Sequence, residues 1–213
     1  MSVYHDERGR RLWALRHGES RANRDGVVVS QPGPLAFTWA RLTERGRMQA
    51  TRSAQATLLA SNTLLVTSDF ARAHETAQIA ANVWGTDTPR VDIRLRERDF
   101  GSLEGGPSDR YNEVWDADSS VQVVPEGVET AEQVARRTKE LVTDLLALPG
   151  SQDIVLVAHG DVLQIIQAWM RGMSPSAHRA LPHLHNAELR QLSGFGNVPG
   201  GAIVESHPSQ VRR

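Results

Sequence analysis

Four short apolar runs, separated by segments with helical spacing, constrain the fold of this chain more than any other feature. Runs this short are typical of strands in a parallel sheet that is covered on both faces. They are Leu12–Leu15, Thr63–Val66, Val91–Ile93 and Ile154–Ala158. Strands that alternate with helices predict an α/β fold, here a three-layer α/β/α sandwich with a mostly parallel central sheet.

The segments between these runs predict helices, because their apolar residues recur on one helical face. The helices expected are 43–60 with Thr43 as N-cap, 71–83, 130–148, and 162–170 with Asp161 as N-cap. Weaker patterns predict further strands over 188–192 and 202–204. Two regions rich in Gly, Pro and polar residues predict a loop over 25–41 and a small lid over 101–125.

The length of 213 residues suits one sizeable domain, although two small domains would also fit on length alone. No internal repeat or long linker marks a boundary, so we predict a single domain over residues 1–213. We expect the last residues, 206–213, to form a mobile tail.

Composition excludes several function classes. The formal net charge of −1 gives no overall field that would attract nucleic acid or an anionic membrane. The absence of cysteine excludes disulfides, thiolate chemistry and the usual structural zinc sites. Residues 1–11 are polar and charged, unlike a signal peptide, and no apolar run approaches the roughly 20 residues that cross a bilayer. We therefore expect a cytoplasmic protein with no nucleic-acid or membrane partner.

Chemically capable side chains follow each predicted strand. Ligands of open α/β sheets bind beyond the carboxyl ends of the strands, so these side chains are expected to converge. The groups are Arg16-His17-Gly18-Glu19, Ser68-Asp69 with Arg72, Arg96-Glu97 and His159-Gly160. Taken singly, each has an ordinary structural interpretation: a histidine at a strand end is usually a hydrogen-bonded structural residue, and Arg72 suits a solvated helix face with an ion pair to Glu75. Their order at successive strand ends favours a site.

Four sequence blocks together resemble the histidine phosphatase superfamily, which includes phosphoglycerate mutases and many small phosphatases. The blocks are Leu15-Arg16-His17-Gly18-Glu19-Ser20 with Asn23, Ser68-Asp69-Phe70-Ala71-Arg72-Ala73 with Thr76-Ala77, Leu95-Arg96-Glu97 with Phe100-Gly101 and Glu104-Gly105, and Val157-Ala158-His159-Gly160. The resemblance extends over residues 12–192, which is nearly the whole chain, and implies a phosphoglycerate mutase-like fold.

The resemblance implies that His17 is a nucleophile that forms a phosphohistidine. An imidazole suits this role when one nitrogen is unprotonated and the other donates a hydrogen bond that fixes the ring. Catalysis of phosphoryl transfer depends on positioned cations and donors. The residues implied to bind or stabilise the phosphoryl group are Arg16, Asn23, Arg72, His159, Gly160 at the start of a helix, and Glu19, for which a structural role is the alternative.

Glu97 is the predicted proton donor to the leaving oxygen, and later the base for the attacking water. It needs a raised pKa for this role, and the sequence leaves open whether Arg96 and Arg98 point inward and oppose that shift. We expect no metal and no cofactor. His183 and His185 have a spacing that could contribute to a metal site, but no third ligand is evident.

Three departures from the mutase pattern favour hydrolysis over phosphoryl return to a second hydroxyl. Ala22 stands where mutases carry tryptophan, Gly106-Pro107-Ser108 replaces an asparagine–lysine pair, and the interval between Glu97 and Glu129 is short. We therefore predict a phosphomonoesterase for a small phosphorylated metabolite, with a mutase as the alternative.

A non-catalytic module that binds a phosphorylated ligand is a further alternative, since fold alone does not settle function. The retained acid Glu97 argues against it. Val128 departs from the glycine of many relatives, so the Glu129 segment is left outside the catalytic set. Specificity is expected to come from the loop, the lid, and either Arg190 or the tail.

Overall fold

The centre of the molecule is a mostly parallel sheet, seen in a computed structural model that describes residues 9–120 and 124–193. Across these residues the sheet has five strands in the spatial order β3-β2-β4-β1-β5. They are β1 (Leu12–Arg16), β2 (Leu64–Thr67), β3 (Arg90–Val91), β4 (Ile154–Ala158) and β5 (Leu189–Ser193). Only β5 runs antiparallel to its neighbour, which confirms the predicted sheet.

The register of the three longest parallel strands brings their carboxyl ends to one edge. Ile154 of β4 lies opposite both Leu12 of β1 and Leu64 of β2, so the three strands start level. β1 and β4 also end level and β2 ends one residue earlier, so the residues that follow the three strands emerge side by side. This register is the reason that His17 and His159 become neighbours.

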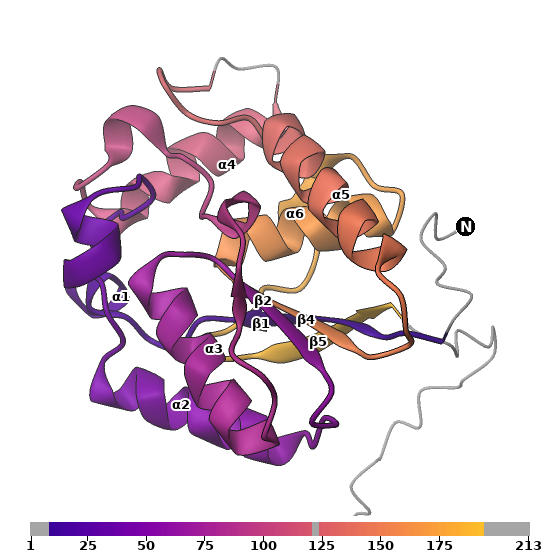
Figure 1. Cartoon of the computed structure of the whole chain (residues 1–213). Helices are drawn as coiled ribbons and strands as arrows, with labels where there is room; N and C mark the ends of the chain where they lie inside the picture. The colour runs from indigo at the N-terminus through magenta and orange to yellow at the C-terminus, as the bar shows by residue number, and fades with distance from the viewer. Residues whose placement is uncertain (1–8, 121–123, 194–213) are drawn as a thin grey trace, which may run out of the picture.

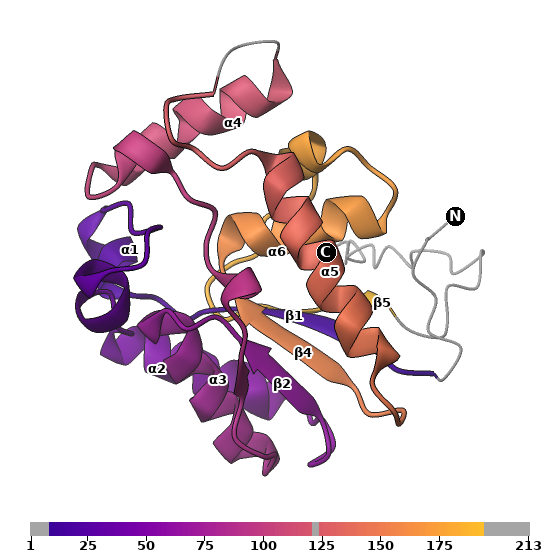
Figure 2. The ribbon, with the colours of Figure 1, turned by 45° about the horizontal axis from the view of Figure 1, so that its top comes forward.

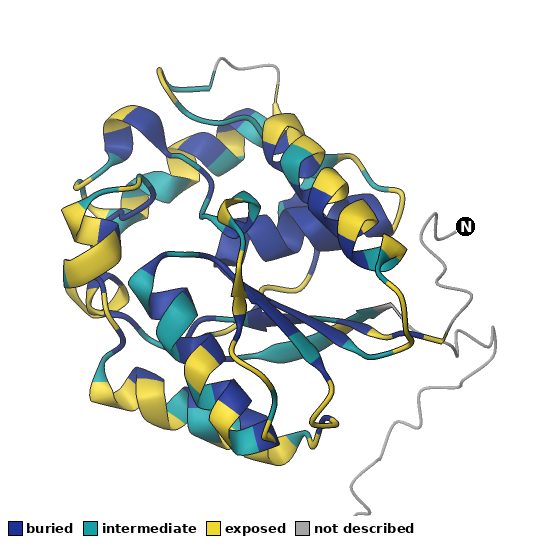
Figure 3. Cartoon of the chain, in the orientation of Figure 1, coloured by how far each residue is buried: buried dark blue, intermediate teal, exposed yellow. Residues whose placement is uncertain are grey.

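Alternate residues of each strand point to opposite faces of the sheet and enter two separate apolar cores. Ile154 and Leu156 pack with helices α5 (Ala131–Ala147) and α6 (Gly160–Met170). Val155 and Val157 pack on the other face, with α2 (Glu44–Ala56) and α3 (Ala71–Trp84). Figures 1 and 2 show these two helix layers enclosing the sheet, as predicted. Every residue of α6 is buried, which Figure 3 shows as a uniformly dark helix.

Side chains at the helix starts explain where the helices begin. Thr43 and Thr130 are N-caps whose hydroxyls accept from Gly46 N–H and Gln133 N–H. At α6 the predicted cap is wrong, because His159 is the N-cap residue and Asp161 already lies in the first turn.

The weakest predicted strand is also corrected. β3 covers only Arg90–Val91, and a 3₁₀-helix follows over Ile93–Leu95. The cause is Asp92, whose carboxylate accepts from the Arg94 N–H and turns the chain away from the sheet.

The predicted loop and lid contain more regular structure than expected. α1 (Arg21–Asp25) ends at the start of the loop, and a π-helical turn follows over Leu35–Trp39. The lid holds α4 (Tyr111–Ser119), together with 3₁₀-helices over Gly101–Leu103 and Ser108–Arg110. A further 3₁₀-helix covers Pro175–Ala180.

Loop and lid pack against each other. Val28 of the loop lies in a small apolar cluster with Leu103 and Val114 of the lid and with Phe100, which directly precedes the lid. Figure 2 shows α4 on the outer side of the molecule, across from the sheet. None of the helices described is long and apolar enough to traverse a bilayer. The predicted strand over 202–204 and the predicted tail lie outside the described residues.

Candidate active site

A cavity of about 240 Å³ opens where β1 and β4 end. Its lining includes six of the residues that the sequence assigned to a site: Arg16, His17, Asn23, Arg72, Glu97 and Gly160. His159 is fully buried directly behind them, with its ring centroid 5.2 Å from that of His17. Segments from four parts of the chain thus meet at the predicted edge of the sheet.

The ring of His17 is buried and held in one tautomer. Nδ1 donates to the carbonyl of Gly18 over 2.7 Å, and Nε2 accepts from Nε of Arg72 over 3.2 Å. Because an arginine only donates, Nε2 carries the lone pair. Burial, and then the charges of Arg72 and Arg16, hold the pKa of His17 well below its usual value. The side chain is therefore a neutral imidazole whose unprotonated nitrogen faces a guanidinium.

The two arginines beside His17 bind no carboxylate in the part of the chain described. Arg16 donates from Nη1 to His183 and to the carbonyl of Leu184, and Arg72 donates from Nη2 to the carbonyl of Val29. Nε of Arg16 and Nη1 of Arg72 are buried and have no hydrogen-bond partner among the described residues. Buried donors are normally satisfied, so this pair indicates a place for an oxyanion.

His159 carries a third buried nitrogen, in a ring that lies next to that of His17. Its Nε2 lies 3.0 Å from the hydroxyl of Ser68, and its Nδ1 has no partner within residues 9–120 and 124–193. When Ser68 donates to Nε2, the ring proton of His159 is on Nδ1, where it is a donor. Burial, followed by the charge of Arg72, lowers the pKa of His159 well below its usual value.

Backbone contacts press the loop after β1 against the start of α2. A Cβ added to Gly18 would lie 2.3 Å from the carbonyl oxygen of Gly46, and one added to Gly46 would lie 2.0 Å from that of Glu19. Only residues without a side chain permit this approach. The close packing fixes the path of the chain directly after His17.

Glu19 lies outside the cavity, which corrects its predicted place in the phosphate site. Its carboxylate accepts from the hydroxyl of Thr43 over 2.8 Å and pairs with Arg45 at 3.4 Å. It therefore does not orient Arg16 or Arg72 either. Its contacts fasten the loop to α2.

Asn23 and Gly160 both border the cavity, for different reasons. The side-chain oxygen of Asn23 accepts from the N–H of Ser20 in a capping box, so the donor that Asn23 can offer is its Nδ2. Gly160 begins α6, and a Cβ there would lie 3.4 Å from the guanidinium carbon of Arg16. The missing side chain lets Arg16 lie against the helix start.

Glu97 lines the cavity with an elevated pKa of about 7. Burial is the main cause and the negative charge of Asp161 is the second, opposed by Arg72, the backbone N–H of Arg98 and Arg16. One carboxylate oxygen accepts from that N–H over 3.0 Å. The geometry and the pKa suit a group that donates a proton near neutral pH.

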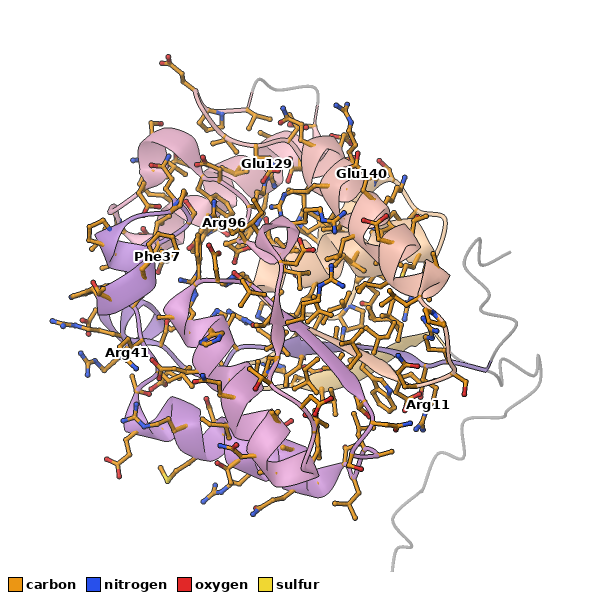
Figure 4. All side chains as sticks on the ribbon, viewed as in Figure 1. Arg11, Phe37, Arg41, Arg96, Glu129 and Glu140 are labelled. Atoms are coloured by element: carbon orange, nitrogen blue, oxygen red, sulfur yellow. The ribbon has the colours of Figure 1, made fainter. Side chains whose placement is uncertain are left out.

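The directions of Arg96 and Arg98 are now defined. Arg96 pairs with Asp69 at 2.6 Å and lies over the ring of Phe37, near which Figure 4 labels it. Arg98 is buried and pairs with Asp118 at 2.5 Å and Asp161 at 3.4 Å. Neither guanidinium lines the cavity, and both are matched by carboxylates, so neither cancels the elevated pKa of Glu97.

Comparison with known proteins agrees with this geometry. The family model of the histidine phosphatase superfamily (branch 1) matches residues 12–199. The chain belongs to this superfamily. It is therefore an enzyme of the histidine phosphatase type, and its fold and the order of its motifs are those that the resemblance implied.

Relatives within the superfamily include phosphatases and proteins named as mutases. The chain is 33% identical to glucosyl-3-phosphoglycerate phosphatase of Mycobacterium tuberculosis over 204 residues, covering 88% of this chain and 86% of that protein. It is 30% identical to probable phosphoglycerate mutase GpmB of Cronobacter sakazakii over 188 residues, covering 85% and 83%.

The solved structures that resemble this chain include phosphatases. A mycobacterial glucosyl-3-phosphoglycerate phosphatase in complex with VO3 superimposes with a TM-score of 0.72 at 30% identity, covering 85% of this chain and 92% of that one. A putative alpha-ribazole-5'-P phosphatase from Escherichia coli superimposes with a TM-score of 0.67 at 26% identity, covering 85% and 88%.

Sequence reasoning missed several residues around this histidine phosphatase site. Tyr111, Trp115, Asp161 and Arg179 all line the cavity. Tyr111 and Trp115 stand four apart on α4, a spacing that places them on one helix face and could have marked a functional surface. For Arg179 no local pattern existed.

Asp161 connects the helix behind the site to the lid. Its carboxylate accepts from the indole N–H of Trp115 over 2.9 Å and lies 3.3 Å from Nε2 of the buried His178. Through Arg98 it also connects to Asp118. A residue expected to cap a helix therefore holds α4 over the cavity.

The remaining residues that the sequence singled out are His183, His185 and Arg190. His183 contacts Arg16 at the cavity mouth, and its ring lies 5.6 Å from that of His185. Across the described ranges, no three His, Cys, Asp or Glu side chains are grouped as metal ligands. Arg190 pairs with Glu188 and donates to the carbonyl of His183, so it fixes this segment and does not line the cavity.

Proposed function

We propose that this enzyme is a metal-independent phosphomonoesterase that acts through a phosphohistidine at His17, on a small phosphorylated metabolite. The observation that carries the proposal is the lone pair on Nε2 of His17, next to buried donor groups of Arg16 and Arg72 that have no partner among the described residues. A nucleophile surrounded by unsatisfied donors suits attack on a phosphorus atom whose oxygens those donors hold. The phosphatase names of the relatives support the same conclusion.

In the first step, Nε2 of His17 attacks phosphorus. The P–N bond forms as the ester P–O bond breaks, and Glu97 gives its proton to the leaving oxygen so that an alcohol departs. Arg16, Arg72 and His159 hold the phosphoryl oxygens during transfer. A guanidinium suits this because it stays charged and binds two oxygens at once.

In the second step, water attacks the phosphorus atom of the phosphohistidine. Glu97, now a carboxylate, takes a proton from the water as the new P–O bond forms and the P–N bond breaks. Inorganic phosphate leaves, and both His17 and Glu97 return to their starting protonation states. An acid with a pKa of about 7 is suited to both directions of proton transfer.

Mutase activity is the second candidate, because relatives at 30% identity are named as probable phosphoglycerate mutases. The segment Gly106-Pro107-Ser108 argues against it, since none of these residues lines the cavity. Their backbone groups bond instead to the loop, with Val28 N–H donating to the carbonyl of Gly106 and Ser108 N–H donating to that of Gly26. Hydrolysis is therefore the favoured reaction.

The test is to trap the intermediate. We expect rapid acid-free quenching with a ³²P-labelled ester to give a phosphoprotein that is stable to base and labile to acid, both with and without chelator. His17→Asn should lose the label and turnover, and His74→Asn, a histidine on α3 outside the cavity, should keep both. Full turnover of His17→Asn, or loss of activity in chelator, would overturn the proposal. Isomer in place of free phosphate when a bisphosphate primer is added would favour the mutase.

A further inference from the structure

Three separate parts of the chain contact the carboxylate of Asp161. Its Oδ1 accepts from the indole N–H of Trp115 on α4 over 2.9 Å and lies 3.3 Å from Nε2 of His178. Its Oδ2 accepts from Nη1 of Arg98 over 3.4 Å. His178 belongs to the 3₁₀-helix over Pro175–Ala180, which packs against α6. The chemistry proposed above gives this histidine no role.

Both ring nitrogens of His178 face acceptors. Nδ1 lies 3.0 Å from the carbonyl oxygen of Pro175, which can only accept, so this nitrogen carries a proton. Nε2 faces a carboxylate oxygen of Asp161, which also can only accept when the carboxylate is ionised. A neutral imidazole has a single N–H, so two acceptors require the doubly protonated ring. The contacts thus describe an imidazolium if Asp161 is ionised.

The surroundings of Asp161 favour its ionised form. Burial by itself raises the pKa of Asp161, but the hydrogen bond and charge of His178, followed by the charges of Arg98 and Arg179, lower it below its usual value. Arg98 also pairs with Asp118 on α4. Helix α5 packs against the same 3₁₀-helix, and none of its side chains forms an ion pair with His178 in the part of the chain described.

A buried imidazolium is stable in this position because each of its N–H groups has an acceptor. The side chain of His178 is fully buried, and that of Asp161 is nearly so. A charge in such a place is costly unless it is paired and hydrogen-bonded. The charges of His178 and Asp161 therefore depend on each other.

This pair adjoins the acid of the site. Glu97 and Asp161 line the same cavity, and the negative charge of Asp161 is the second cause, after burial, of the raised pKa of Glu97. A positive charge held against Asp161 weakens the field that Glu97 experiences. The protonation of His178 thus affects how readily Glu97 gives up its proton.

We infer that His178 is a buried imidazolium that keeps Asp161 ionised and fixed in place, and that through Asp161 it is a positioning residue for the acid Glu97. The effect on Glu97 rests on the proposed phosphatase function, whereas the charge of His178 does not.

The charge of His178 is measured directly on the wild-type enzyme. We expect ¹⁵N NMR near neutral pH to show protons on both ring nitrogens of His178. The ring of His17, with a proton on Nδ1 only, provides the neutral reference in the same spectrum. A single proton on the ring of His178 would overturn the inference, and this measurement does not require a variant to fold.

The role toward Glu97 is measured by the pH dependence of kcat/KM for an alkyl phosphate, which falls on its basic limb as Glu97 loses its proton. His178→Gln keeps an N–H that can donate to Asp161 but carries no charge, so Asp161 should act more strongly on Glu97. We expect the basic limb to move to higher pH. Well above the limb, the variant should keep a roughly threefold to tenfold larger fraction of its maximal kcat/KM than the wild type.

His74→Gln, on α3 outside the cavity, is the matched control and should leave the limb in place. A limb in His178→Gln that stays in place or moves to lower pH would overturn the role toward Glu97, and lower stability in urea alone would show a merely structural residue. In the background of Asp161→Asn, His178→Gln should move the limb no further, and a further shift would overturn action through Asp161. Failure of the wild type to hydrolyse even an aryl phosphate would overturn the proposed function, while the NMR result would still decide the charge of His178.

Discussion

Nε of Arg72 donates to Nε2 of His17 over 3.2 Å, and both side chains are buried. This contact identifies Nε2 as the nitrogen that carries the lone pair of the nucleophile. The same guanidinium has Nη1 without a partner among the residues described, and its Nε is released when Nε2 bonds to phosphorus, so both nitrogens can then donate to the oxyanion. Nucleophile and electrostatic partner thus lie in contact, His17 just after strand β1 and Arg72 in the first turn of α3.

Replacing Arg72 should slow phosphoryl transfer, because its guanidinium contacts His17 and has a donor left for the oxyanion. We expect Arg72→Lys to lower kcat/KM roughly 10²–10³-fold, since a lysine cannot bind two phosphoryl oxygens with the fixed fork of a guanidinium. Arg52→Lys, on the exposed face of α2, is the control and should change little. Steady-state kinetics provide the measurement, and ¹⁵N NMR should show His17 of the wild type protonated on Nδ1. A loss below threefold would contradict the role given to Arg72.

The dependence of kcat/KM on pH should reflect the ionisation of Glu97. The acid must be protonated for the first step, so kcat/KM for an alkyl phosphate should fall as pH rises through about 7. Glu97→Gln should remove this basic limb and lower kcat/KM roughly 10²–10⁴-fold. Nitrophenyl phosphate should suffer less, because its leaving group departs without a proton. An equal loss for both esters would show that Glu97 is not the acid.

Asp161 should determine the pH at which the basic limb of this kcat/KM profile falls. Its negative charge is the second cause of the raised pKa of Glu97, so Asp161→Asn should move the basic limb to lower pH. The variant should also lose about 2 kcal/mol of stability, because charged hydrogen bonds within the buried group around Arg98 and His178 are weakened. Asp116→Asn, exposed on α4, is the control for both readouts. An unmoved limb with reduced stability would leave Asp161 a purely structural residue.

Gly46→Ala tests the close packing beneath the His17 loop. In a helix, alanine is favoured over glycine by about 1 kcal/mol, so propensity alone predicts stabilisation. A Cβ at Gly46 would lie 2.0 Å from the backbone oxygen of Glu19, which has no side-chain freedom to move away. Overpacking of this kind costs about 1–3 kcal/mol or more, so we expect net destabilisation in urea unfolding. Gly33→Ala, with no atom within 4 Å, should be close to neutral, and equal behaviour of the two variants would refute the contact.

Much of the fold followed from local patterns. The strand at Ile154–Ala158 and the helix at Ala131–Ala147 were predicted within a residue or two, because buried strands and amphipathic helices carry their periodicity in consecutive residues. The prediction failed where one side chain redirected the chain. Asp92 ended β3 early by bonding to Arg94, and α4 was hidden within a polar stretch whose apolar residues pack on the loop.

The site residues also divide into those that the sequence placed correctly and those that it did not. Arg16, His17, Arg72 and Glu97 lie together in one cavity, as strand-end positions and the family resemblance predicted. Glu19 does not lie in the cavity, since its carboxylate accepts a hydrogen bond from Thr43 at the start of α2. The roles of these residues in catalysis stay predictions until the variants are measured.

The order of short apolar runs and the residues that follow them were enough to determine the layered sheet, the family and the reactive edge, because parallel strands of similar length end level. Only the tertiary structure decided which charges are matched. Arg96 and Arg98 form ion pairs with carboxylates from distant segments, whereas Arg179 lines the cavity with no ion pair among the described residues. Ion pairing joins residues far apart in the chain, and its geometry is set by packing, so no local pattern records it.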